Sequence, residues 1–152
     1  MEPRIETKDA FWVMGVPAHG DPKALDYQQI WGTLFMSVHG QLQAVSTDGQ
    51  YYGVYFDTDE PGQVDFIAGM AVAAGTEVPA GLEARELPAA RYAVFDATMS
   101  TIGSAWDEIM SRWLPQSPYE YDASKVSFEF FASDMGEGPD APMMIFVPVT
   151  AG

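Results

Sequence analysis

The 152-residue sequence predicts one α+β domain made of two similar halves, with a single antiparallel sheet and two helices on one of its faces. The first observation is repetition, because the pattern strand, helix, strand, strand occurs over residues 4–75 and again over residues 82–150. The second is a hydrophobic fraction of 47%, enough for a substantial core. The third is the short connection at residues 75–81, which favours a shared sheet over independent domains. We therefore expect residues 1–152 to form a single domain.

The first half contains four expected elements. A strand is expected over residues 5–16. A helix is expected over residues 22–38, where large apolar residues recur three or four positions apart until a histidine–glycine pair ends the pattern. Residues 51–56 and 65–72 form a strand pair, since the acidic segment 57–62 between them contains the proline and glycine typical of turns.

The second half repeats this order. Residues 82–97 are expected to be extended, and a helix is expected over residues 100–113, with a serine suited to cap its start and a leucine–proline pair to stop it. Residues 126–131 and 142–149 are the matching strands, joined by a turn-forming loop over residues 134–142. Both helices direct large aromatic side chains toward the sheet.

Charge excludes some function classes and favours others. Seven Lys and Arg residues against 22 Asp and Glu give a net charge of −15. Such a chain would be repelled by a phosphate backbone, which argues against direct nucleic-acid binding, while its field favours cations. The sequence has no cysteine and no apolar run long enough to cross a membrane, so a cytoplasmic protein is the expectation.

Metal and nucleotide chemistry lack the residues they need. His19 and His39 have no partner histidine or cysteine at ligand spacing, and the stretch Asp57–Gly62 lacks the acidic positions of a calcium loop. No glycine-rich phosphate cradle joins a strand to a helix. We therefore expect neither a metal site nor a cofactor.

One carboxylate stands apart from the rest. Glu129 interrupts an otherwise apolar strand, and alternation places it on the same face as Ser127 and Phe131. If the helices cover that face, Glu129 is surrounded by rings and needs partners, a raised pKa or a cationic ligand. If the face is wet, Glu129 is an ordinary solvated residue.

Aromatic residues complete a candidate binding site. Trp31 and Trp106 occupy similar places in the two expected helices and are predicted to meet across the seam between the halves. Alternation along the strands and position in the repeat add Tyr52 and Phe131 as residues expected to line the site, with Phe56 as a weaker candidate. Rings around a single carboxylate suit a lipophilic cation, through cation–π contact and charge neutralisation. For any single ring, the alternative is a simple core position.

Several segments in this order resemble the GyrI-like effector-binding domain family. They are Pro88–Phe95, Trp106–Ser117, Phe128–Phe131 and Met144–Val149, with Tyr52–Asp57 matching the first half. The resemblance implies the duplicated fold, a ligand pocket between the halves, and binding of hydrophobic cations by aromatic residues and an acidic residue, which maps by motif onto Glu129. The family includes the sensing domains of multidrug-responsive transcription regulators and free-standing proteins such as integron cassette proteins.

These observations predict a module that binds small lipophilic cations. No helix-turn-helix precedes the domain, so operator binding by this chain alone is not expected. Because some relatives are hydrolases, one alternative is an enzyme in which Glu129 acts as general base on water near an electrophile. Another is an acidic module that docks a basic protein partner, and a homodimer is left open.

Overall fold

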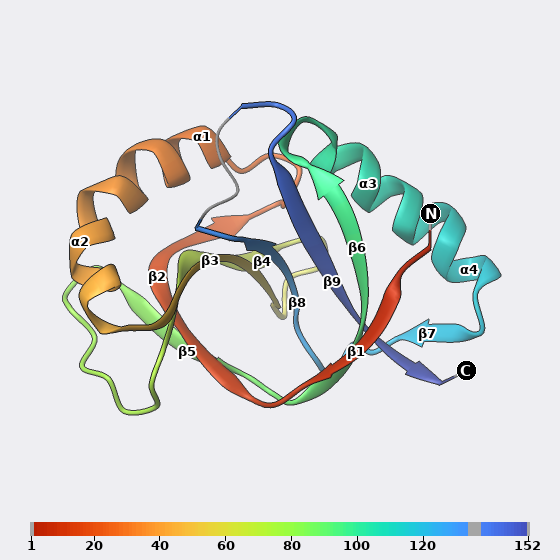
Figure 1. Ribbon diagram of the computed structural model, residues 1–152, viewed down its shortest axis with the longest axis horizontal. Coiled ribbons are helices and arrows are strands. Elements are labelled where there is room, and N and C mark those ends of the chain that lie inside the picture. Colours follow the sequence, from red (N-terminus) through yellow and green to blue (C-terminus); the bar gives the residue numbers. More distant parts are fainter. Residues whose placement is uncertain (1, 134–137, 152) are drawn as a thin grey trace.

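The structure is a computed structural model that describes residues 2–133 and 138–151, so part of the predicted loop 134–142 lies outside the described residues. Within them, nine strands form a curled antiparallel sheet, and two helices lie on the same side of it (Figure 1). The strands are β1 (Arg4–Lys8), β2 (Phe11–Gly20), β3 (Ser46–Asp57), β4 (Val64–Val72), β5 (Glu83–Leu87), β6 (Ala90–Thr98), β7 (Tyr119–Tyr121), β8 (Ser127–Phe131) and β9 (Pro142–Ala151). The predicted α+β class is confirmed.

The strand order shows the duplication. It reads β1-β6-β9-β8-β3-β4-β2-β5, with β7 beside β9. The order is the same from either end when each strand is exchanged for its counterpart in the other half, so a pseudo-twofold axis passes between β3 and β8. At the outer edges the halves exchange strands, because β1 pairs with β6 and β5 pairs with β2. The two halves therefore share one sheet, as predicted.

Each long strand expected at the start of a half is two strands in the structure. Residues 5–16 divide between β1 and β2, and residues 82–97 divide between β5 and β6. The break comes where the chain leaves one half of the sheet for the other. In the second half, Pro88 lies at this break, where it removes one backbone donor from the ladder.

The first helix is longer than predicted. It runs through α1 (Tyr27–Gln29), the π-helical stretch η1 (Ile30–Phe35) and α2 (Met36–Val45). The expected stop after residue 38 is wrong, because burial of Leu42 against the sheet extends the helix past the histidine–glycine pair. Packing of an apolar side chain outweighs the modest cost of a glycine within a helix.

The second helix has the same construction. It runs through η2 (Met99–Thr101), α3 (Ile102–Glu108), the π-helical stretch η3 (Ile109–Trp113) and α4 (Leu114–Gln116). Its cap is the reciprocal pair Thr98 and Thr101, in place of the expected serine. The leucine–proline pair lies in the last turn. Pi-helical turns are rare, and here one interrupts each helix.

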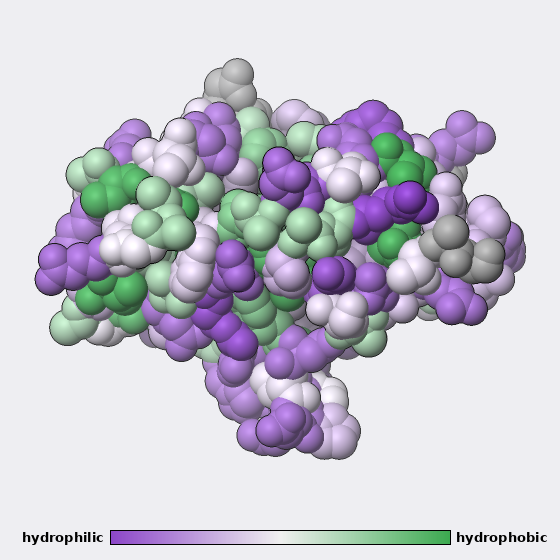
Figure 2. Space-filling model, turned by 90° about the horizontal axis from the view of Figure 1, so that it is seen from below, coloured by the Kyte–Doolittle hydropathy of each residue, from purple (hydrophilic) through white to green (hydrophobic). Residues whose placement is uncertain are grey.

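Both faces of the sheet are packed. One cluster fills the face away from the helices and includes Val54, Tyr92 and Phe128. Two others lie between the sheet and the helices, one centred on Phe66 and the other on Ile145. Seen from below, apolar side chains show in the middle of the surface and in patches toward both ends, with polar side chains between them (Figure 2). No helix in the part of the chain that the structure describes is long and apolar enough to cross a membrane.

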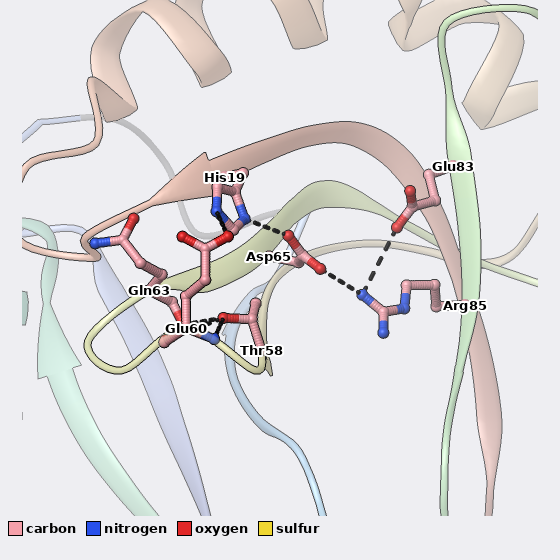
Figure 3. A network of polar contacts seen from close by, with 7 residues as sticks. All are labelled: His19, Thr58, Glu60, Gln63, Asp65, Glu83 and Arg85. Carbon is pink, nitrogen blue, oxygen red and sulfur yellow. Dashed lines mark hydrogen bonds and ion pairs between the residues drawn. The ribbon is translucent and has the colours of Figure 1, made fainter.

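Strands β2, β4 and β5 are also joined by a polar network (Figure 3). His19 Nδ1 of β2 lies 2.7 Å from Asp65 Oδ1 of β4, and Arg85 Nη1 of β5 donates to Asp65 Oδ2 over 3.4 Å. The Asp65 carboxylate accepts a hydrogen bond from the protonated His19 ring, which raises the pKa of His19. These groups are partly exposed, so the network orients the strand ends more than it stabilises the domain.

Strands β2 and β4 approach closely at a glycine pair. Gly15 and Gly69 face each other in register. A Cβ atom on Gly69 would lie 2.2 Å from the Met14 carbonyl oxygen, and one on Gly15 would lie 2.0 Å from the Ala68 carbonyl oxygen. Backbone atoms cannot yield as a flexible side chain can, so these positions require glycine.

Gly69→Ala is expected to lower the free energy of unfolding by at least about 3 kcal/mol, because the new methyl group overlaps backbone atoms. Gly40→Ala is the control: a Cβ atom at Gly40 meets nothing within 4 Å, so a gain of up to about 1 kcal/mol is expected from helix propensity. Urea unfolding followed by circular dichroism measures both. Equal stabilities of the two variants would contradict the close packing.

Candidate functional site

Glu129 lies at the centre of the molecule, on the pseudo-twofold axis. It is in the middle of β8, directly opposite Gly53 of β3, and its exposed fraction is 4%. A Cβ atom on Gly53 would lie 3.2 Å from Glu129 Oε1 and 3.2 Å from the Phe66 ring. The absence of a side chain at Gly53 therefore makes the space that the carboxylate occupies.

Two donors hold the carboxylate in place. Tyr55 Oη donates to Glu129 Oε2 over 2.9 Å, and Trp106 Nε1 donates to the same oxygen over 2.8 Å. Tyr55 comes from β3 and Trp106 from α3, so the sheet and a helix meet at this oxygen. Burial raises the pKa of Glu129 to about 7, although both hydrogen bonds act in the opposite direction.

A cavity of about 450 Å³ opens beside Glu129, and we call it the acidic pocket. Its walls include Tyr27, Tyr55, Trp106, Met110 and Ser127. Two further carboxylates, Asp57 and Asp107, also line it, with Lys23 as the one cation among the lining residues. The Lys23 Nζ lies 4.0 Å from Asp107 Oδ1. The pocket thus has an excess of negative charge, and four of its lining residues are aromatic: Tyr27, Tyr55, Trp106 and Tyr121.

A second cavity of about 560 Å³ shares the lining residue Tyr27 with the first, and we call it the aromatic pocket. It lies over the π-helical stretch η1 and is lined by Trp31, Phe35, His39, Tyr51 and Phe131 among others. The Trp31 ring packs against Phe35 and Phe131, with centroids 4.9 and 5.6 Å away. Tyr27 lines both pockets and therefore stands between them.

The predicted site residues fall into three groups. Trp106 contacts Glu129, while Trp31 and Phe131 lie together in the aromatic pocket. The expected meeting of Trp31 with Trp106 is not found: Trp31 contacts Phe35 and Phe131, whereas Trp106 contacts Tyr55. Trp31 and Trp106 are also not equivalent positions of the two helices. The π-helical stretches begin at Ile30 and Ile109, and Trp106 lies three positions before the second of these, as Tyr27 lies three positions before the first.

Tyr52 and Phe56 are placed incorrectly by the sequence analysis. Both belong to the cluster on the face away from the helices, so they cannot line a pocket with Glu129. Tyr52 pairs with Phe130 in the β3–β8 ladder and donates a hydrogen bond to Asp48. Phe56 packs beneath Arg85, whose guanidinium carbon lies 4.0 Å from the ring centroid. The sequence analysis therefore assigned the alternating side chains of β3 to the wrong faces of the sheet.

Tyr51 and Tyr55 are the site residues that the correct parity selects. They pair with Phe131 and Ser127, on either side of the Gly53–Glu129 pair. The only signal available in the sequence was Gly53 itself, because a glycine opposite a glutamate in a strand pair leaves room for that side chain. Tyr27, near the start of the first helix, was also missed.

Together, a buried carboxylate, aromatic lining residues and two cavities that share Tyr27, at the seam of a duplicated fold, describe a domain that binds small molecules. The family comparison agrees. A model described as the GyrI-like small molecule binding domain matches residues 1–150, and the chain belongs to this family.

Individual relatives show how far the likeness extends. The transcriptional regulator BrlR of Pseudomonas aeruginosa is 26% identical over 153 residues, covering 98% of this chain and 56% of BrlR, so the chain spans little more than half of that relative's length. The structure of SAV2435 bound to tetraphenylphosphonium is 15% identical with a TM-score of 0.77, covering 99% of this chain and 94% of that one. An integron cassette protein from Vibrio cholerae is 14% identical with a TM-score of 0.57, covering 99% and 97%. The two structures share the fold.

Ionisation of Glu129 is expected to cost stability. Its pKa is about 7 in the folded chain and near 4.5 when unfolded, so the unfolded state releases its proton first and stability falls as the pH rises from about 4.5 to 7. The loss above pH 7 is on the order of 3 kcal/mol. Glu129→Gln keeps an oxygen for both donors and removes this loss.

Urea unfolding of Glu129→Gln and the unmodified chain at pH 4 and pH 8 measures this effect. The variant should be the more stable of the two at pH 8 and close to the unmodified chain at pH 4. A stability difference independent of pH would mean that Glu129 has the same pKa in both states.

Proposed function

We propose that the acidic pocket binds lipophilic organic cations, with the ionised Glu129 carboxylate as the counter-charge. The observation that carries this proposal is a carboxylate that is 4% exposed, has two neutral donors and lies beside an open cavity. No cationic side chain contacts it among the described residues. A bound cation would supply the charge that the fold leaves out.

The surroundings of Glu129 favour an organic cation over a hydrated ion. Trp106 and Tyr55 present rings to the cavity, and such rings attract a diffuse positive charge by cation–π contact. Asp57 and Asp107 add a negative field at the same cavity without being buried. Aromatic walls also reward removal of apolar surface from water, at about 25 cal/mol per Å².

The relatives support the same class of ligand. SAV2435, which shares the fold, has been solved with the lipophilic cation tetraphenylphosphonium. BrlR is a transcriptional regulator, and the present chain matches about half of its length. We infer that the domain acts as a sensing module, whose output depends on occupancy of the pocket.

Glu129→Gln should weaken tetraphenylphosphonium binding at least about tenfold at pH 8, since it removes the counter-charge and little else. Binding of neutral triphenylphosphine oxide should change less than about threefold. Isothermal titration calorimetry measures both ligands. Glu77→Gln is the matched control, because it makes the same change in net charge at an exposed position outside the pocket. Equal losses for both ligands would contradict a role for charge.

The affinity of the unmodified chain for tetraphenylphosphonium should depend on pH. Protonation below about pH 7 neutralises Glu129, so affinity should fall roughly tenfold between pH 8 and pH 6, whereas Glu129→Gln should show a flat profile. Fluorescence titration across this range tests the dependence. A fall of the same size in Glu129→Gln would assign it to other groups.

Hydrolysis is the second candidate function, and the near-neutral pKa of Glu129 is the observation that favours it. A carboxylate with a pKa of about 7 is suited to accept a proton from water at neutral pH. The rate at which the protein hydrolyses activated esters or epoxides should then depend on Glu129, and Glu77→Gln should retain the full rate. Turnover that survives Glu129→Gln would remove this candidate.

A further inference from the structure

The two pockets are related to each other by the pseudo-twofold axis. The aromatic pocket contains the cross-strand pair Tyr51–Phe131, and the acidic pocket contains the pair Tyr55–Ser127. These pairs lie at equal distances along β3 and β8 from the central Gly53–Glu129 pair. Each pocket is therefore built on one side of the same seam.

The helices contribute equivalent positions to the two pockets. Counted from Ile30, where η1 begins, the third residue before it is Tyr27 and the second after it is Gly32. Counted from Ile109, where η3 begins, the same positions are Trp106 and Ser111. Tyr27 and Gly32 line the aromatic pocket, whereas Trp106 and Ser111 line the acidic pocket. The duplication has thus produced two copies of one cavity.

The copies differ in charge. The residues that line the aromatic pocket include no aspartate, glutamate, lysine or arginine, and all of them lie within the described chain. Its histidine, His39, has Nε2 3.0 Å from Tyr51 Oη, so this ring nitrogen already has a partner. Its other lining residues include the aromatic side chains of Trp31, Phe35 and Phe131. Such a surface suits a neutral apolar group.

We propose that the aromatic pocket is a second compartment of the ligand site, which takes a neutral aromatic group while the cationic group of the same molecule lies beside Glu129. The ligand is then a molecule with a cationic group and an aromatic group joined by a linker. The linker would lie beside Tyr27, the residue common to both pockets. This proposal rests on the proposed function of the acidic pocket. Cavities of about 560 and 450 Å³ each hold a one- or two-ring system.

Gly32 allows one compartment to be closed without damage to the fold. It lines the aromatic pocket, and a Cβ atom there meets nothing within 4 Å. Gly32→Leu should therefore fill the cavity while improving helix propensity. Gly40→Leu is the matched control, since it places the same side chain in open space on the same helix, outside the pocket.

Three compounds distinguish the compartments. They are benzyltrimethylammonium, a naphthyl group joined to trimethylammonium by three methylenes, and the uncharged analogue of the second compound with a tert-butyl group in place of trimethylammonium. The affinity of each for the unmodified chain, Gly32→Leu, Gly40→Leu and Glu129→Gln is measured by calorimetry at pH 8. Thermal melts confirm that each variant is folded.

Gly32→Leu should weaken both naphthyl compounds at least tenfold and leave benzyltrimethylammonium within twofold. Glu129→Gln should weaken the two cations and leave the uncharged compound within twofold. If Gly32→Leu leaves the naphthyl compounds unaffected, or weakens all three compounds equally, the second compartment is wrong. If Glu129→Gln leaves benzyltrimethylammonium unaffected, the proposed function of the acidic pocket is wrong instead.

Discussion

The pairing of Gly53 with Glu129 is the constraint on which the site depends. Both residues lie at the pseudo-twofold axis, where the two halves of the sheet meet. A carboxylate is accommodated there because the first half supplies Gly53, which leaves space, and the Tyr55 donor, while the second half supplies the Trp106 donor. The chemistry of the site is therefore fixed by one asymmetric pair in an otherwise symmetric arrangement.

Duplication explains how two kinds of surface arise from one scaffold. The π-helical stretches begin at Ile30 and Ile109 and place equivalent positions over equivalent strand pairs. The residues around those positions nevertheless differ between the two cavities, so that one has an excess of carboxylates and the other is lined by rings without a charged side chain. A fold that repeats its backbone can in this way vary its side chains independently on each side, which suits ligands that are themselves asymmetric.

The sequence predicted the fold well and the site in part. Repetition and periodicity gave the order of elements. Alternation within β8 grouped Glu129 with Ser127 and Phe131 on one face but left open whether the helices cover it, and the structure places Trp106 of α3 against that face. The parity of β3 could not be read in the same way, because apolar or aromatic residues occupy both of its faces: Tyr52 and Val54 are buried away from the helices, and Tyr51 and Tyr55 are partly buried beneath them. A strand covered on both faces shows no alternation of polarity. The length of the first helix depended on burial of Leu42, a tertiary contact that local propensity does not contain.

The exchange of edge strands has a consequence for how the chain folds. β1 finds its partner, β6, about ninety residues further along the chain, since Arg4 pairs with Val94. During synthesis the first half therefore emerges with β1 unpaired and with the place later taken by β5 still open. Pairings this distant in sequence slow the search for the native state, so the second half completes the folding of the first.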